Sequence, residues 1–427
     1  MRLRHALSAG LLDAGLASLA TLAVGVYAAR SLSAAELGTY ALFFSAFTVA
    51  AVLPTQLLLV PAEVATLLEG PHERLRVLRS GWRLGLPAAA AAAGLASAAA
   101  WLGASAPLEV LWPFAVTMTA CGIVSPLQDH LRRSLHMAGE HWRAATVSLV
   151  QFAAVIAVLA VAERAAAPSL WRPFGALALA NVVSLSTGYW LSRRDLRGVT
   201  DLSHRIAPLA RSGQWLVLVE LATSGALFLS SAIITQLASA ETLGYAEAAR
   251  IVAQPLYVVA VGVSAAVWPR SMEAAAGRRE QAARRIARLS AAILVAVGVL
   301  YGALTIVPWW GNPLGVLVPQ AYAVDGLVLV SVLALVLVGV AFPPRTELIG
   351  AGLERSLVRV ALLAGIVQCL AAVASPWIGA FARPVGVGLF AIVLLLGCWH
   401  YRRRLYQGSE ATTPRSPGAA PGTRRPV

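Results

Sequence analysis

The chain has 427 residues, of which 58% are hydrophobic and only 13% are charged, and its mean hydropathy is +0.72. A soluble protein of this length cannot hide so much apolar surface, so the composition excludes a soluble globular enzyme or binding protein. The net charge is +14, but the basic residues mostly flank apolar stretches, which argues against a nucleic-acid-binding protein. All 34 basic residues are Arg. Without Lys, the chain cannot form a Walker A ATPase site or a Schiff base.

Apolar runs long enough to cross a bilayer recur along the whole chain. We place them at about 10–29, 38–60, 84–104, 108–127, 144–162 and 172–192, and then at about 214–237, 244–268, 289–308, 323–342, 357–377 and 382–400. The pattern predicts an all-α polytopic membrane protein with about 12 transmembrane helices. The first run follows Arg2 and Arg4 as a signal peptide does, but its length and the many later runs favour an uncleaved helix.

A short motif occurs twice, 206 residues apart, each time between two apolar runs. The first copy is Ser33–Gly38 and the second is Ser239–Gly244. Each begins with a Ser suited to cap a helix and reaches a Gly where the next apolar helix starts. A second echo is offset by 213 residues and relates Arg132, Leu135 and Ala138-Gly139 to Arg345, Leu348 and Ala351-Gly352.

Two echoes with similar offsets indicate a duplicated chain. We therefore predict two six-helix halves around a central cavity. The first comprises residues 1–205 and the second residues 206–405. The remaining residues, 406–427, are rich in Pro, Gly, Ser, Thr and Arg and are predicted to form a disordered cytoplasmic tail.

The Arg residues concentrate in alternate connections between the runs. If the N-terminus is cytoplasmic, 29 of the 34 lie on the inner side, and only Arg30, Arg164, Arg172, Arg250 and Arg383 remain for the outer side. This distribution predicts a multi-pass protein of the inner (plasma) membrane with both termini in the cytoplasm. The inner clusters are expected to meet anionic lipid headgroups, and Arg172 and Arg383 to meet headgroups at the outer helix starts.

Acidic residues lie at matching places in the first and seventh predicted spans. Asp13 and Glu220 are 207 residues apart, so they occupy almost equivalent places in the two halves. An ionised acid in the middle of a bilayer costs about 2.5–3.5 kcal/mol, and such a group usually faces a water-filled cavity or a partner. Both are therefore candidates for proton or cation coupling, or for contact with a polar headgroup. The alternative is that each lies near the inner interface and is simply hydrated.

Four residues are candidates for substrate binding: Arg30, Arg250, Gln56 and Gln254. Arg250 follows Glu247 by three residues, so a local ion pair is one explanation of its presence. The other is that Arg250 and Arg30 present guanidinium groups to a diphosphate in the cavity, with Gln56 and Gln254 as neutral donors.

No pattern predicts catalysis. His130, His136 and His141 lie near Asp129 and Glu140, but their spacing does not bring all three onto one helix face, so we interpret them as part of a solvated loop rather than a metal site. The outer connections are short and carry few acidic groups. We therefore expect no enzyme activity, no catalytic residues, no metal and no cofactor.

Three segments resemble a known superfamily. Ala29–Gly38 and Leu243–Arg250 are similar to the first and second outer turns of the multidrug/oligosaccharidyl-lipid/polysaccharide exporter (MOP) superfamily, and within it to the bacterial polysaccharide-biosynthesis flippases. Arg132–Gly139 is similar to the loop after the fourth helix of that group. The resemblance covers most of residues 1–400.

The resemblance implies a V-shaped pair of bundles that flips an undecaprenyl-diphosphate-linked oligosaccharide across the bacterial inner membrane by alternating access, for surface polysaccharide synthesis. The partners it implies are the polyprenyl-diphosphate-linked glycan, membrane lipids, and the glycosyltransferases and polymerase of the same pathway, with no nucleic acid.

The competing hypothesis is a proton- or cation-coupled exporter of small molecules or drugs, of the same fold or of the major-facilitator fold. Asp13 and Glu220 suit a coupled antiporter, which needs carboxylates in its cavity. A major-facilitator transporter usually has a long basic connection between its halves, whereas the link Arg193–Arg211 is short. A scaffold without transport is a third hypothesis, for which the intramembrane acids offer little support.

Overall fold

The computed structural model describes residues 2–65, 75–166, 169–196, 206–307 and 312–410. The first six long helices in these ranges, with the short segments between them, are α1 (Arg2–Ser31), α2 (Ala34–Pro54) continued by the π-helix η1 (Thr55–Leu59) and α3 (Val60–Ala65), α4 (Arg76–Gly103), α5 (Leu108–Met137), α6 (His141–Arg164), η3 (Ser169–Trp171) and α7 (Arg172–Ser192). The other six are α8 (Ile206–Leu237), α9 (Ala240–Ala276), α10 (Glu280–Leu304), η5 (Pro313–Val316), η6 (Gln320–Tyr322), α11 (Leu327–Gly350), α12 (Glu354–Val373), α13 (Ser375–Ile378), η7 (Gly379–Phe381) and α14 (Ala382–Glu410).

Twelve helices of the described ranges are long and apolar enough to cross a membrane, which confirms the predicted number. Their bounds differ from the predicted runs. The fourth span of the first half continues to Met137, ten residues past its predicted end, whereas the fifth span of the second half ends at Val373, four residues before its predicted end. The extra turns before Met137 carry charged residues, which the apolar pattern does not count.

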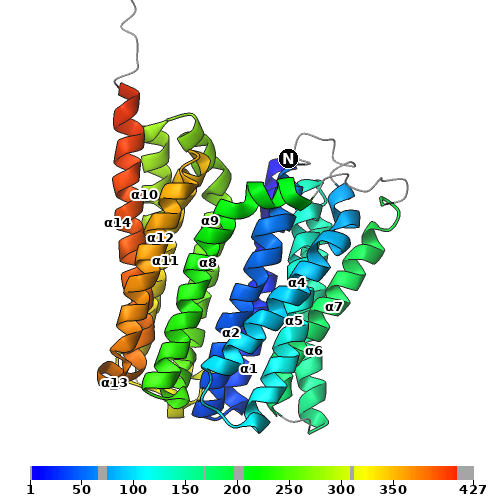
Figure 1. The fold of residues 1–427 in the computed structure, drawn as a ribbon, viewed down its shortest axis with the longest axis vertical. Helices are drawn as coiled ribbons and strands as arrows, with labels where there is room; N and C mark the ends of the chain where they lie inside the picture. The colour runs from blue at the N-terminus through cyan, green and yellow to red at the C-terminus, as the bar shows by residue number, and fades with distance from the viewer. Residues whose placement is uncertain (1, 66–74, 167–168, 197–205, 308–311, 411–427) are drawn as a thin grey trace, which may run out of the picture.

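The helices pack as two groups, α1 to α7 and α8 to α14, with the same pairings in each. In the first group α1 packs on α6, α6 on α7 and α7 on α5, and in the second α8 packs on α12, α12 on α14 and α14 on α11. Figure 1 shows the start of α1 and the end of α14 at the same end of the bundle. We call this the termini-bearing end and the opposite one the far end.

The two groups share one apolar core at the far end, where Phe43 and Phe114 of the first group belong to the same cluster as Val252 and Leu327 of the second. Toward the termini-bearing end the cores are separate. One lies around Leu131 in the first group, and the other lies around Leu357 in the second group. The groups are therefore joined by apolar packing at one end more than at the other.

The repeated motif forms the joint at the far end. Ser33 and Glu36 form a capping box at the start of α2, and the Ser239 hydroxyl accepts a hydrogen bond from the Thr242 N–H at the start of α9. One turn later α2 and α9 cross so closely that a Cβ at Gly38 would overlap the carbonyl oxygen of Ala240. In the same way, a Cβ at Gly244 would overlap the carbonyl oxygen of Ala34. Only Gly fits at the two equivalent positions.

The second echo also has a structural basis. Gly139 and Gly352 follow α5 and α11 in the left-handed conformation, with φ of +84° and +71°. In both places the N–H of the following residue donates to a carbonyl five residues earlier, as in a Schellman cap: the Glu140 N–H to Leu135 and the Leu353 N–H to Leu348, each at 2.9 Å. Both echoes therefore mark equivalent turns, as expected of a duplicated chain.

The first residues of the predicted tail are helical. α14 continues to Glu410, and Tyr406 packs against Ala274 and Ala283. The prediction of disorder is therefore wrong for residues 406–410, where the helix continues and Tyr406 has a surface to pack on. Residues 411–427 lie outside the described ranges.

Candidate functional site

A polar stripe runs along one face of α9. Glu247, Arg250, Gln254 and Tyr257 follow one another at intervals of three and four residues, which places them on the same face of the helix. Arg250 donates two hydrogen bonds to the Glu247 carboxylate, at 2.8 and 2.6 Å, and one to the Gln254 amide oxygen at 3.5 Å. The local ion pair anticipated for Arg250 is therefore present.

A second Arg shares the same carboxylate. Nη1 of Arg383, from the first turn of α14, donates to Oε2 of Glu247 at 2.5 Å. Glu247 and Arg383 are both fully enclosed, and Nε of Arg383 has no hydrogen-bond partner among the described residues. Two guanidinium groups and one carboxylate leave this triad with one excess positive charge inside the membrane span.

This position of Arg383 corrects the prediction that it meets lipid headgroups. The short segments α13 and η7 precede α14, so Arg383 lies inside the bundle and not at its surface. The same prediction is wrong for Arg172, whose guanidinium donates to Glu163 and to the Tyr27 hydroxyl. In both cases a nearby acid provides a partner that the apolar pattern did not reveal.

The stripe faces the first group of helices. The Arg250 guanidinium lies 5.3 Å from the ring centroid of Phe44, and Phe44 contacts the rings of Tyr40 and Phe47 on the same helix α2. A Cβ at Gly25 of α1 would lie 3.8 Å from the Gln254 amide oxygen. The stripe therefore lies at the seam between the two groups, with a charged surface on α9 and an aromatic one on α2.

Toward the termini-bearing end, the stripe meets a second ion pair. Arg345 of α11 donates to Glu220 of α8. Tyr257 of α9 is exposed, and its ring centroid lies 6.4 Å from that of Phe342, which precedes Arg345 by three residues on α11. Arg345 and Tyr257 were not among the predicted site residues, although the echo of Arg132 in Arg345 pointed to the first of them.

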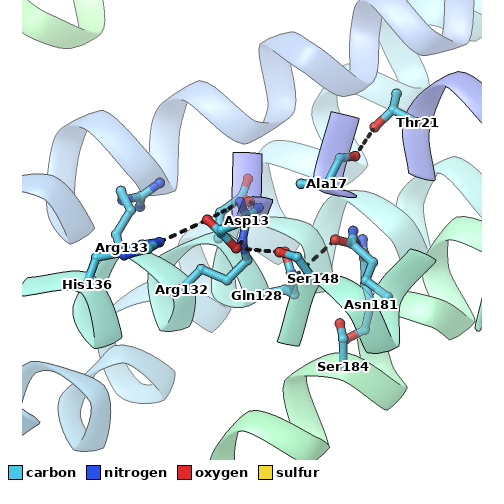
Figure 2. Close-up of polar contacts among 12 residues, drawn as sticks. Asp13, Ala17, Thr21, Gln128, Arg132, Arg133, His136, Ser148, Asn181 and Ser184 are labelled. Carbon is cyan, nitrogen blue, oxygen red and sulfur yellow. Dashed lines mark hydrogen bonds and ion pairs between the residues drawn. The ribbon is translucent and has the colours of Figure 1, made fainter. Parts of the chain in front are cut away.

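Asp13 is held in a buried cluster in the first group (Figure 2). Arg132 forms two parallel hydrogen bonds with its carboxylate, at 2.9 and 2.8 Å. Ser148 donates to the same carboxylate at 2.5 Å, and His136 Nε2 lies 3.0 Å from it. The prediction of a simply hydrated acid is wrong for Asp13, because protein groups occupy both of its oxygens.

The interpretation of the histidines as part of a solvated loop is also wrong. α5 continues through this region, and His130 is buried with Nδ1 2.6 Å from the Glu63 carboxylate. His136 lies between Asp13 and His141, and the Nδ1 atoms of the two histidines are 3.1 Å apart. No cluster of three or more metal-binding side chains occurs within the described ranges.

The other two predicted binding residues lie near the ends of the bundle. Arg30, at the end of α1, donates to the carbonyl oxygen of Val316 at 2.7 Å, so it connects the two groups at the far end. Gln56 lies in η1, after Pro54, and a Cβ at Gly213 of α8 would overlap its backbone carbonyl oxygen. Of the four predicted residues, Arg250 and Gln254 are joined by a hydrogen bond.

Comparisons with known proteins place the fold. No family model matches the sequence, and no curated protein matches it. Among solved structures, the chain is similar to an inward-facing conformation of a multidrug resistance MATE family transporter of the MOP superfamily, with 16% identity, 93% of this chain and 96% of that chain covered, and a TM-score of 0.72. It is also similar to an outward-facing conformation of such a transporter, with 16% identity, 96% of this chain and 97% of that chain covered, and a TM-score of 0.67.

A MOP superfamily transporter from Pyrococcus furiosus, described as having a binding pocket of reverse polarity that suggests a different function, is 16% identical, with 94% of this chain and 96% of that chain covered and a TM-score of 0.63. The chain therefore has the fold of MOP superfamily transporters over almost its whole length. This confirms the predicted fold class, and these three neighbours do not include a polysaccharide flippase.

Proposed function

We propose that this protein is a membrane transporter that exports small amphipathic molecules by alternating access. The observation that carries the proposal is the stripe on α9, with its Arg250 guanidinium against the aromatic face of α2 at the seam of two similar helix groups. A charged group beside aromatic rings, inside a span, suits a ligand with one charged end and one apolar end.

The unequal joining of the two groups supports alternating access. The shared core and the Gly38–Gly244 crossing hold them together at the far end, while their cores are separate toward the termini-bearing end. We expect export to require the far-end joint to open while each group moves as a rigid unit. If the termini are cytoplasmic, as the Arg distribution predicts, the structure corresponds to an inward-facing state, in line with its greater likeness to the inward-facing neighbour.

The excess positive charge of the Glu247, Arg250 and Arg383 triad favours a substrate whose polar end is anionic or zwitterionic. A lipid-linked oligosaccharide, bound through its diphosphate, is therefore the second candidate substrate. The neighbours described as multidrug resistance transporters favour a small molecule over this lipid. Of the two proposed coupling acids, Glu220 is the more accessible, because Asp13 is enclosed by its partners.

A pair of disulfides tests alternating access. A Cβ at Gly103 of α4 would lie 3.2 Å from the Cβ of Ala232 in α8, close to the separation of about 3.8 Å in a disulfide. The double variant Gly103→Cys/Ala232→Cys, with Cys121, Cys369 and Cys398 replaced, joins the two groups at the far end. We expect oxidation to abolish transport in vesicles and reduction to restore it.

The matched control joins two helices of one group. A Cβ at Gly365 of α12 would lie 3.1 Å from the Cβ of Ala226 in α8, so Gly365→Cys/Ala226→Cys forms a similar disulfide without crossing the seam. It should leave transport intact. Equal transport by the oxidised and reduced cross-seam variant would contradict the proposal.

The substrate is tested with Arg250→Ala and Arg250→Lys in cells. Loss of extrusion of amphipathic dyes, with surface polysaccharide unchanged, supports the small-molecule exporter. Loss of surface polysaccharide, with the variant still present in the membrane, supports the lipid-linked oligosaccharide. Normal dye extrusion and normal polysaccharide in both variants would remove Arg250 from the substrate site.

A further inference from the structure

A groove of about 250 Å³ lies on the surface of the first helix group, in the half nearer the termini-bearing end. α5 forms its floor with Val124 and Leu127, and α4 and α7 form its walls with Leu86 and Val182. These walls are exposed although they are apolar, and they belong to membrane spans. The groove therefore opens to the hydrocarbon of the bilayer rather than to water.

The end of the groove nearest the termini is closed by aromatic side chains, and basic residues lie close to it along α4 and beyond the end of α7. Trp82 and Tyr189 close it, with their ring centroids 5.8 Å apart. Beside them are two exposed Arg residues. Arg83 follows Trp82, and Arg193, one turn beyond Tyr189, lies with its guanidinium 5.0 Å from the centroid of the Trp190 ring. Aromatic rings at this level are typical of the membrane interface, and a guanidinium group binds phosphate through two parallel hydrogen bonds.

A second groove, formed by α4 and α5, provides a contrast. It lies toward the far end, has a volume of about 600 Å³ and is lined by Gly94, Ala98, Trp101 and Trp112, among others. It is larger and equally apolar, but no basic residue lies within one turn of its lining residues along α4 or α5. An apolar chain fits both grooves, but basic residues lie within one turn of the lining residues along the helices only at the smaller one.

We propose that the groove between α4, α5 and α7 is a binding site for an anionic phospholipid of the leaflet at the termini-bearing end. One acyl chain lies along Leu86, Leu127 and Val182, and the headgroup phosphate is bound by Arg83 and Arg193. This site is on the outer surface of the first group, away from the stripe on α9, and it does not depend on the proposed transport function.

Native mass spectrometry of the full chain, with phosphatidylglycerol or phosphatidylcholine added in detergent, measures the bound lipid. We expect one retained phosphatidylglycerol per chain and at least fivefold less phosphatidylcholine. Ser186→Trp, an exposed position that lines the groove, should reduce phosphatidylglycerol retention at least fivefold. Ala98→Trp fills the far groove in the same way and should leave retention unchanged.

The double variant Arg83→Gln/Arg193→Gln tests the charges without altering the apolar groove. It should abolish the preference for phosphatidylglycerol over phosphatidylcholine. Arg403→Gln is its control and should leave the preference unchanged. The Arg403 guanidinium also lies beside an aromatic ring, 3.5 Å from the centroid of Trp399, at the same end of the bundle but in the second group. Equal retention of the two lipids by the unaltered chain, or equal losses in Ser186→Trp and Ala98→Trp, would overturn the proposal.

Discussion

The two helix groups contain the same ion pair in different surroundings. Asp13–Arg132 and Glu220–Arg345 join equivalent helices at equivalent depths. The Asp13 side chain is 6% exposed, whereas the Glu220 side chain is 30% exposed. The additional partners of Asp13, His136 and Ser148, are replaced 213 residues later by Ile349 and Ala361, which cannot bond a carboxylate.

The helices at the seam differ in the same sense. Glu247 and Arg250 of α9 correspond, 206 residues earlier, to Ala41 and Phe44 of α2. The structural devices of the duplication are present in both groups: the crossing glycines, the helix caps and one acid–Arg pair. At the stripe, the charged side chains of the described residues come from the second group, through Glu247, Arg250 and Arg383. We infer that the first group provides a closed polar core and an aromatic surface, while the second provides the charges available to a ligand.

The largest expected effect comes from opening the closed cluster. Asp13→Asn removes the carboxylate that compensates Arg132 and leaves a buried cation without its main partner, so we expect a loss of stability of about 3–5 kcal/mol. The measurement is the midpoint of thermal unfolding in detergent. Asp129→Asn is the control, since Asp129 bonds the same Arg132 from an exposed position and should cost about 0–1 kcal/mol. Equal midpoints for the two variants would contradict the contrast.

The next effect tests what the two groups have in common. Gly38→Ala places a Cβ against the backbone carbonyl of Ala240, so the α2–α9 crossing has to widen, at a cost of about 1–3 kcal/mol or more. Gly244→Ala should cost a similar amount because the crossing is symmetric. At Gly10 of α1 nothing lies within 4 Å of an added Cβ, and Gly10→Ala should be neutral or slightly stabilising. A neutral Gly38→Ala, measured in the same way, would remove the close crossing from the joint.

The sequence predicts the number of spans and both echoes, because apolar length and Gly or Ser at turns are local signals. It does not predict the ion pairs. Asp13 and Arg132 belong to separate patterns in the sequence, and each has a counterpart with nearly the same offset, but a hydropathy pattern gives the depth of a residue and not the direction of its side chain around the helix. An acid that recurs in both halves (Asp13 and Glu220) and an Arg that recurs in both halves (Arg132 and Arg345) are the signal from which the pairing could have been inferred.

The same limit of local sequence patterns explains why the ion pair of Arg250 was predicted and the contact of Arg383 was not. The sequence predicts the ion pair of Glu247 and Arg250, because side chains three residues apart are neighbours on a helix. Arg383 reaches the same Glu247 across 136 residues, and its burial depends on the short segments that precede α14. No pattern within a single helix contains that information.

A smaller effect concerns the connection between α10 and α11, which contacts the first group at the far end. The Tyr322 hydroxyl donates to the Leu32 carbonyl oxygen at 2.9 Å, and Tyr322→Phe should cost about 1 kcal/mol. Burial raises the pKa of Tyr322 to about 12, so the folded state keeps a proton that the unfolded state loses above about pH 10. The contribution is therefore complete below pH 10 and is lost as the pH rises to 12. Thermal unfolding of the two proteins should differ at pH 8 and converge between pH 10 and 12, whereas a constant difference would contradict this account.

The smallest effect on stability is expected at the open counterpart of Asp13. Glu220→Gln removes a partly exposed carboxylate with one Arg partner, so it should cost about 0–1 kcal/mol, against about 3–5 kcal/mol for Asp13→Asn. If Glu220 couples transport to an ion, the same variant should lose transport in vesicles while its unfolding midpoint stays near that of the unaltered protein. Arg345→Gln should have the larger effect on stability of the two, because its guanidinium is the more enclosed partner. A midpoint for Glu220→Gln as low as that for Asp13→Asn would mean that the two ion pairs serve the same structural purpose, and the distinction between a closed first group and an open second group would fail.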